Sequence, residues 1–263
     1  MKLGLMPGDV MPAAEMRAFG FEALQMFFGW NRQDDAGDPG PEDIAAALKP
    51  GNLPLAAMTI HIDLVGPTGA IGPEENRAVR CVAKTAALKD QFDGDGKPIL
   101  IWHPSEYPDS KPGVDDNAVF RGLCSALGKM CAAAEKQNVN VAVEITRSGS
   151  VGSAEAFLRI KDMVASPALK VCLDAANFVP DRTPLERAVR MLAKDVVIAH
   201  AKDSRFAENG EVAAYGATGT GKLDYAKYMR CLRDYCPVPY MILEYFKNRD
   251  ELLRARDIIL THM

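Results

Sequence analysis

The sequence lacks the features typical of membrane proteins, secreted proteins and proteins with Cys-x-x-Cys motifs. It has no uninterrupted apolar run of about 18 residues, so we expect no transmembrane helix and no membrane partner. Its N-terminal segment has one lysine followed by Gly-Leu-Met-Pro-Gly-Asp, which is too interrupted for the apolar core of a secretory signal. It has no Cys-x-x-Cys pair, and its six cysteines lie mostly in apolar runs, which predicts buried free thiols. Buried free thiols are typical of a reducing compartment, so we expect a cytoplasmic protein.

An excess of basic charge is also missing. The chain has 31 Lys and Arg residues against 35 Asp and Glu residues, a net charge of −4. Proteins that hold a nucleic-acid backbone usually present a strong positive field, so we expect no nucleic-acid partner. Hydrophobic residues make up 48% of the 263 residues and charged residues 25%, as in ordinary folded proteins. The length suits one large domain, and assembly into a homo-oligomer stays open.

The sequence does contain a regular alternation of short apolar runs and helical stretches. The apolar runs have the length and β-branched content of buried parallel strands. They cover residues 2–6, 23–28, 55–61, 99–103, 139–144, 169–174, 196–200 and 238–244. Helical patterns cover residues 11–19, 41–49, 73–91, 115–137, 153–165, 184–194, 224–235 and 249–262. The pattern therefore predicts an α/β protein with parallel strands.

The number of units favours one architecture. A (β/α)8 barrel needs eight strand–helix units in about 250 residues, so we predict a single barrel domain over residues 1–263. A doubly wound sheet is the alternative. Its first loop should be the Gly-x-Gly-x-x-Gly of a nucleotide-binding fold, whereas the first loop here reads Met6-Pro7-Gly8-Asp9.

Ionisable residues end four consecutive predicted strands. Alternate residues of a strand face opposite sides, and the three valines of 139–144 share one parity, which places Glu144 on the interior side. The same argument makes Asp174, His200 and Glu244 the last interior residues of their strands. These strand ends form the active-site face of such barrels, so we expect the four side chains to converge.

A divalent cation would relieve the repulsion among three converging carboxylates. Oxygen ligands with one imidazole suit Mn²⁺, Mg²⁺, Co²⁺ or a catalytic Zn²⁺. His61 and His103 end two further strands with the same interior parity. A single histidine at a strand end is more often structural, but six ionisable residues on one face indicate a functional site. An error of one residue in the phase of a strand would reverse its assignments.

The motifs at these positions resemble those of a known family. They are Val-Glu144-Ile-Thr, Leu-Asp174-Ala-Ala-Asn177, His200-Ala-Lys-Asp203, Gly219-Thr-Gly221-Lys-Leu-Asp224-Tyr and Leu-Glu244-Tyr. In order and spacing they are similar to the xylose-isomerase-like TIM-barrel superfamily of sugar (phosphate) isomerases and epimerases, the AP endonuclease family 2-like barrels. The resemblance implies a metal held by Glu144, Asp174, His200 and Glu244. In the family's epimerases the two glutamates also form the acid/base pair.

Two departures narrow this resemblance. Asn177 stands where many members carry a histidine, and an amide can bind a hydroxyl but does not titrate near neutral pH. The endonuclease IV-like repair enzymes of the superfamily hold three zinc ions and need an Asp-x-His, whereas the corresponding loop here reads Glu211-Val-Ala-Ala-Tyr215-Gly. The sequence therefore disfavours a repair phosphoesterase.

These observations predict a divalent-metal-dependent isomerase or epimerase of a small sugar, sugar phosphate or keto-sugar. The reaction would be proton transfer through a metal-stabilised enediolate, with Glu144 and Glu244 removing and returning the proton. Substrate contacts are expected from His61, His103, Asn177, Lys202, Arg205, Arg147 and Trp30. A metal-dependent dehydratase of an inosose-like substrate is the alternative. A non-catalytic carbohydrate-binding barrel is disfavoured because all four ligand positions are filled.

Overall fold

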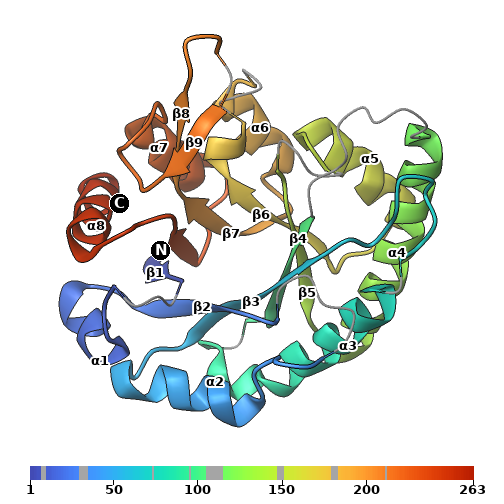
Figure 1. Ribbon diagram of the computed structural model, residues 1–263, viewed down its shortest axis with the longest axis horizontal. Coiled ribbons are helices and arrows are strands. Elements are labelled where there is room, and N and C mark those ends of the chain that lie inside the picture. Colours follow the sequence, from blue (N-terminus) through green and yellow to red (C-terminus); the bar gives the residue numbers. More distant parts are fainter. Residues whose placement is uncertain are drawn as a thin grey trace. The chain divides into compact units, whose positions relative to one another are not determined.

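The computed structural model describes residues 1–6, 10–29, 35–72, 74–94, 96–104, 115–146, 151–178, 183–210 and 212–263. Within these residues, eight parallel strands form a closed barrel in the order β1-β10-β7-β6-β5-β4-β3-β2 (Figure 1). The strands are β1 (Lys2–Leu5), β2 (Ala23–Phe27), β3 (Leu55–Ile62), β4 (Ile99–Pro104), β5 (Asn140–Glu144), β6 (Leu169–Asp174), β7 (Val196–Ala201) and β10 (Tyr240–Leu243). The predicted (β/α)8 barrel is confirmed.

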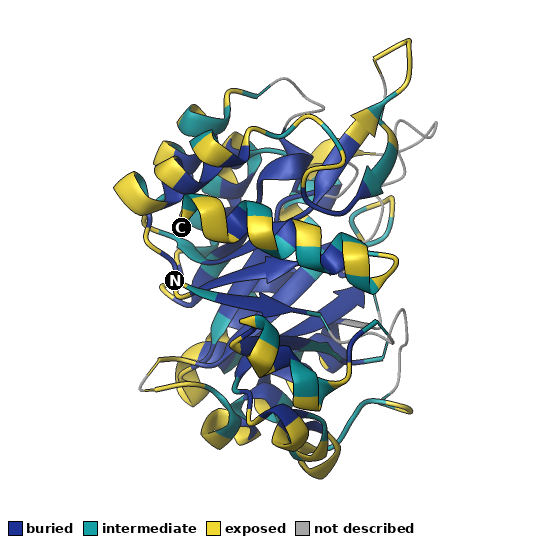
Figure 2. Cartoon of the chain, turned by 90° about the vertical axis from the view of Figure 1, so that its left-hand side faces the viewer, coloured by how far each residue is buried: buried dark blue, intermediate teal, exposed yellow. Residues whose placement is uncertain are grey.

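Helices alternate with the barrel strands along the chain. They are α1 (Ala13–Met16), α2 (Pro41–Leu48), α3 (Glu74–Ala87), α4 (Asp116–Gln137), α5 (Ala154–Val164), α6 (Leu185–Leu192), α7 (Tyr225–Tyr235) and α8 (Arg249–His262). The side chains of Asp115, Ser153, Asp224 and Asn248 cap the N-termini of α4, α5, α7 and α8 by accepting a backbone N–H. Figure 2 shows buried strands in dark blue and helices with one buried and one exposed side, as amphipathic patterning requires.

Two strands begin later than the patterns predict. The run 139–144 starts as a strand at Asn140, because the N–H of Val139 donates to the Ala134 carbonyl at the end of α4. The run 238–244 is a strand only over Tyr240–Leu243, since Pro239 has no N–H to donate to a neighbouring strand. Glu244 follows the strand, and its N–H donates to the Ala201 carbonyl at 3.1 Å.

The sequence patterns do not predict a small second sheet. Strands β8 (Asp203–Phe206) and β9 (Val212–Gly216) form an antiparallel pair between β7 and α7. Ser204 pairs with Tyr215 in this hairpin, and its tip over residues 207–210 is exposed. The hairpin thereby places β9 next to the residues that directly follow β7.

Contacts divide the chain into two compact units. The first comprises Met1–Gln25, Ala46–Ala56 and Cys172–Met263, and the second comprises Met26–Ala45 and Ala57–Val171. In the first unit the strands pack closely at Gly4, where an added Cβ would lie 2.7 Å from the Ile242 side chain. In the second unit Trp102 is fully buried and donates its indole N–H to the Ile62 carbonyl at 3.0 Å.

The remaining expectations about the chain's chemistry concern thiols and membranes. All six cysteines lie in the described residues, all are buried, and none forms a disulfide, as predicted. None of the helices in the described ranges has both the length and the apolar character needed to span a bilayer.

Candidate metal centre

Three of the predicted metal ligands lie together in the first unit. Asp174 ends β6, His200 lies in β7 and Glu244 follows β10, and their exposed fractions are 0%, 0% and 6%. Each offers one ligand atom, and these atoms lie within 4.8 Å of one another. Nδ1 of His200 faces Oε1 of Glu244. Two buried carboxylates and an imidazole at this spacing form a donor set that fits Mn²⁺, Mg²⁺, Co²⁺ or Zn²⁺.

Lys202 supplies positive charge to this cluster. Its ammonium nitrogen lies 2.5 Å from Oδ2 of Asp174 and 3.8 Å from Oε2 of Glu244, and the residue is buried. The same nitrogen lies 5.0 Å from the ring centre of Tyr215 and 5.3 Å from that of Tyr245. Two aromatic faces and two carboxylates therefore surround the ammonium group of one lysine, which offsets part of the negative charge of the cluster.

Two tyrosines of α7 contact the backbone at the strand ends that carry the predicted ligands. The Tyr228 hydroxyl contacts the carbonyls of Leu173 and His200, at 2.9 and 3.2 Å. The Tyr225 hydroxyl donates to the Lys202 carbonyl at 2.7 Å. Burial raises the pKa of both tyrosines well above the usual value, so both hydroxyls stay protonated and remain donors. The sequence does not reveal these two residues, because both occupy ordinary buried positions of an amphipathic helix.

Asp203 organises the glycine-containing loop of the family motif. Its carboxylate accepts hydrogen bonds from the backbone N–H groups of Ser204 (2.9 Å), Leu223 (3.0 Å) and Gly219 (3.2 Å). A Cβ added to Gly221 would lie 2.3 Å from Oδ1 of Asp203, so the loop can close on the carboxylate only with glycine there. Asp203 thus anchors the loop that leads into α7.

Gln25 is a further residue of this centre that the motifs do not reveal. It is fully buried in β2, and its Oε1 lies 2.9 Å from Nε2 of His200. A signal for it exists in the sequence, because Gln25 is the one polar residue in the apolar run 23–28 and shares the parity of Ala23 and Phe27. Its amide therefore faces His200, one of the predicted ligands.

The second unit holds the remaining strand-end residues. Glu144 ends β5 and is 3% exposed, and its Oε1 lies 3.8 Å from Nε2 of His103. His61 and His103 are register partners on β3 and β4, and their rings stack at 4.2 Å between centres. The Phe27 ring stacks on His61 at 5.9 Å. The structure therefore brings Glu144, His61 and His103 together.

The other predicted site residues are placed less uniformly. Asn177 is buried in the short helix η4 (Ala175–Asn177) directly after β6, close in sequence to Asp174. Arg205 lies on β8 with an exposed side chain. Arg147 and Trp30 lie outside the described residues. Glu144 belongs to the second unit, whereas Asp174, His200 and Glu244 belong to the first.

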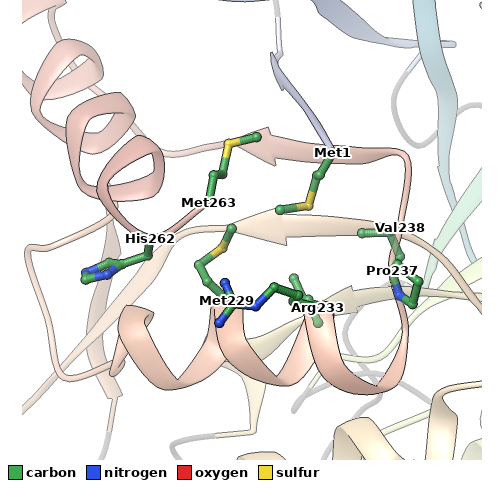
Figure 3. Close-up of a pocket in the computed structure, with 8 residues that line it drawn as sticks. Met1, Met229, Arg233, Pro237, Val238, His262 and Met263 are labelled. Atoms are coloured by element: carbon green, nitrogen blue, oxygen red, sulfur yellow. The ribbon is translucent and has the colours of Figure 1, made fainter.

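A pocket shown in Figure 3 lies away from these strand ends. Met1, which precedes β1, and Val238, which precedes β10, line it together with Met263 and Arg233. It therefore opens where the first unit's strands begin, whereas active sites of such barrels lie where the strands end. His262 also lines this pocket and is therefore not part of the group of three strand-end histidines.

Comparison with known proteins yields a family and a set of similar structures. A family model described as a xylose isomerase-like TIM barrel matches residues 13–261. The structure of 3-keto-D-glucoside 4-epimerase from E. coli is similar, with 15% identity, a TM-score of 0.72, and coverage of 100% of this chain and 98% of that chain. D-allulose 3-epimerase from Methylomonas sp. is 13% identical with a TM-score of 0.70, covering 98% of this chain and 89% of that one.

A third similar structure has a different kind of activity in its name. It is a probable 3-DHS dehydratase from Bacillus anthracis, with 13% identity, a TM-score of 0.70 and coverage of 99% of both chains. No curated protein sequence matches this chain significantly. At these identities the similarity of the structures establishes a shared fold.

Proposed function

Since this chain belongs to the xylose isomerase-like TIM barrel family, we propose that it is a divalent-metal-dependent isomerase or epimerase of a small keto-sugar or sugar phosphate. The observation that carries this proposal is the buried cluster of Asp174, His200 and Glu244, whose ligand atoms lie within 4.8 Å of one another. Lys202 offsets part of the negative charge of the two carboxylates, and a bound divalent cation would offset the rest.

The proposed ligand set has four members. Asp174, His200 and Glu244 come from the first unit, and Glu144, which ends β5 in the second unit, would complete the set. A bound divalent cation would polarise a substrate carbonyl and lower the cost of negative charge on its oxygen. We leave the identity of the ion to experiment, with Mn²⁺, Co²⁺, Mg²⁺ and Zn²⁺ as candidates.

The protein's own residues would move the proton. One of Glu144 and Glu244 would remove a proton from the carbon next to the carbonyl, and the other would return one to the opposite face in an epimerisation. Lys202, Asn177 and His103 carry the polar groups suited to sugar hydroxyls, and the rings of Tyr215 and Tyr245 offer faces for the C–H side of a sugar. Arg205, with Arg147 and Trp30, extends this proposed contact set.

The similar structures support the substrate class. Two of them are named for epimerisation of a keto-glucoside and of D-allulose, which are small carbohydrates with a carbonyl group. We propose a substrate of that class, and no macromolecular substrate. The buried thiols support a reducing compartment, so we also propose that the protein works in the cytoplasm.

The test combines metal analysis with isotope exchange. After Mn²⁺, Co²⁺ and Zn²⁺ are each offered, we expect about one ion per chain, lost in Asp174→Asn and His200→Ala. Incubation with a panel of ketoses in D₂O should then place deuterium next to the carbonyl. Glu208→Gln, a change at the exposed tip of the β8–β9 hairpin, is the matched control for loss of a carboxylate. No stoichiometric ion in any condition would refute the proposal, and two or three tightly bound ions would favour a repair-type phosphoesterase.

A dehydratase is the second candidate. The same base could remove a proton while a hydroxyl leaves from the neighbouring carbon, and one similar structure is named as a probable 3-DHS dehydratase. Product analysis by NMR separates the two reactions, because elimination yields an unsaturated product and one water. Loss of water from an inosose or a cyclic keto-acid, with no epimer formed, would replace the epimerase proposal with this one.

A further inference from the structure

We propose that Gln25 is a positioning residue that sets the tautomer and orientation of the His200 ring, and through them the affinity of the centre for a divalent cation. The inference rests on the proposed function, because it assigns His200 to a metal. It concerns a residue that contributes no ligand atom. Both side chains are fully buried, so water does not compete for their contact.

The geometry divides the work of the imidazole between its two nitrogens. Nε2 lies 2.9 Å from Oε1 of Gln25, and Nδ1 faces Oε1 of Glu244. An amide oxygen only accepts hydrogen bonds, so when a cation is bound at Nδ1 the ring proton belongs on Nε2. That arrangement keeps the lone pair of Nδ1 on the side of the carboxylates. Histidines that bind metals commonly donate their other N–H to a fixed acceptor in this way, which fixes the ring.

The opposite orientation of the amide would have the opposite effect. If the NH₂ group of Gln25 faced Nε2, that nitrogen would have to accept, and the ring proton would move to Nδ1. A protonated Nδ1 would donate to Glu244 and would not bind a metal. The orientation of one buried amide therefore decides whether His200 is a ligand.

The main chain around both residues is held in place. β2 pairs with β1 through Gly4–Ala23 and Leu5–Leu24, which fixes the strand that carries Gln25. The carbonyl of His200 lies 3.2 Å from the Tyr228 hydroxyl of α7. Gln25 of β2 thus holds the ring of His200, and Tyr228 of α7 holds its backbone. Loss of the amide contact should therefore change the orientation of the ring and leave the backbone in place.

The first experiment reads the tautomer directly. The chain has only four histidines, so ¹H–¹⁵N spectra of the imidazoles can be assigned with single His→Gln variants. In the Zn²⁺-loaded protein we expect the His200 ring to carry its proton on Nε2. In Gln25→Leu we expect the Nε2–H signal to weaken or disappear, because the proton has lost its acceptor. A ring of the unmodified protein protonated on Nδ1 would overturn the proposal.

The second experiment measures Co²⁺ affinity and the visible spectrum of the Co²⁺ form. Gln25→Leu should weaken binding by about 10–100-fold and alter the spectrum, as losses of such partners do. Gln25→Glu keeps an acceptor at the same place and should bind Co²⁺ more like the unmodified protein. Thr85→Val is the matched control, because it removes a buried hydrogen bond to the Cys81 carbonyl within α3. It should leave Co²⁺ affinity unchanged.

The outcomes separate this inference from the proposed function. If the unmodified protein binds none of the cations, the proposed function fails, and the role of Gln25 that rests on it fails as well. If it binds Co²⁺ and Gln25→Leu binds equally well with the same spectrum, the role of Gln25 fails alone. Should Gln25→Leu not fold, the tautomer of the unmodified protein and the affinity of Gln25→Glu decide the question.

Discussion

The two compact units hold their functional side chains by different means. In the first unit Asp174, His200 and Glu244 are fixed by Lys202 and by buried hydrogen bonds. In the second unit His61 and His103 are stacked ring on ring, and the His103 side chain is 26% exposed. Buried side chains held by charge pairs and hydrogen bonds suit a centre that must hold an ion in one geometry. A stacked pair of rings of which one, that of His103, is partly exposed suits contact with a substrate that enters and leaves.

Glu144 and Glu244 belong to different units. Changing each in turn tests whether the two units also have different roles in catalysis. Glu→Gln at either position keeps the size of the side chain but removes the base. Turnover should fall by about 10²–10⁴-fold in both variants. Each variant should lose D₂O exchange from a different substrate epimer, as measured by NMR.

Two results would contradict that scheme. Equal loss of exchange for both epimers would make the glutamates ligands only, with His103 as the next proton carrier. Turnover without any deuterium incorporation would indicate a hydride shift, and the reaction would be an aldose–ketose isomerisation.

Lys202→Met tests how strongly the first unit depends on internal charge pairing. The change leaves Asp174 and Glu244 buried without their nearest ammonium group. Breaking a buried ion pair in this way costs about 3–5 kcal/mol, so the metal-free protein should unfold at clearly lower urea concentration. Saturating Mn²⁺ should restore part of the loss. Lys222→Met, at an exposed position, is the control, and an equally small effect of both changes would contradict the prediction.

Gly221→Ala tests the anchor formed by Asp203. The new Cβ would lie 2.2 Å from the Ser204 carbonyl and 2.3 Å from the Asp203 carboxylate, so the loop must shift. We expect a loss of about 1–3 kcal/mol in the free energy of unfolding. Gly128→Ala in α4 meets nothing within 4 Å and should instead stabilise the protein slightly, because alanine favours helix. Thermal unfolding of the two variants in opposite directions is the expected result.

Tyr228→Phe and His103→Gln give the smallest effects and the sharpest contrast. Tyr228→Phe removes a hydroxyl from the Leu173 and His200 carbonyls and should cost about 0.5–1.5 kcal/mol. It should also weaken metal binding. His103→Gln should change the free energy of unfolding little and lower turnover at saturating metal. Interchanged effects, with stability lost at His103 and turnover at Tyr228, would contradict the division between the units.

Hydrophobic patterning was sufficient to predict the barrel and most of its element boundaries. Buried parallel strands are continuous apolar runs, so each produces a distinct signal. The β8–β9 hairpin produces no such signal. Residues 203–206 are mostly polar, and they form a strand by pairing with β9, which follows later in the chain. The strand beginning at Tyr240 is shorter than predicted because Pro239 has no N–H to donate. The apolar pattern does not reveal this missing donor.

The candidate site was predictable to the extent that strand parity determines it. Asp174, His200 and Glu244 are the last polar residues of apolar strands, and the structure gathers them. Gln25 carries the same signal in a strand whose end has no ionisable residue. Tyr225 and Tyr228 were not predictable, because a helix residue that reaches a strand-end carbonyl has the same pattern as a core residue. Contacts across sequence separations such as 25 to 200 arise only when the barrel closes.

The exposed tip of the β8–β9 hairpin makes site-selective labelling feasible. Burial raises the pKa of Cys81 and Cys131 to about 12 and that of Cys236 to about 11, so these thiols are almost entirely unreactive at neutral pH. All six native cysteines are buried, whereas residues 207–210 are exposed. In a Glu208→Cys variant, a thiol-reactive fluorophore would therefore react only at the new cysteine. It would sit on the hairpin that carries Tyr215 and could report, by its emission, when a ligand contacts that ring.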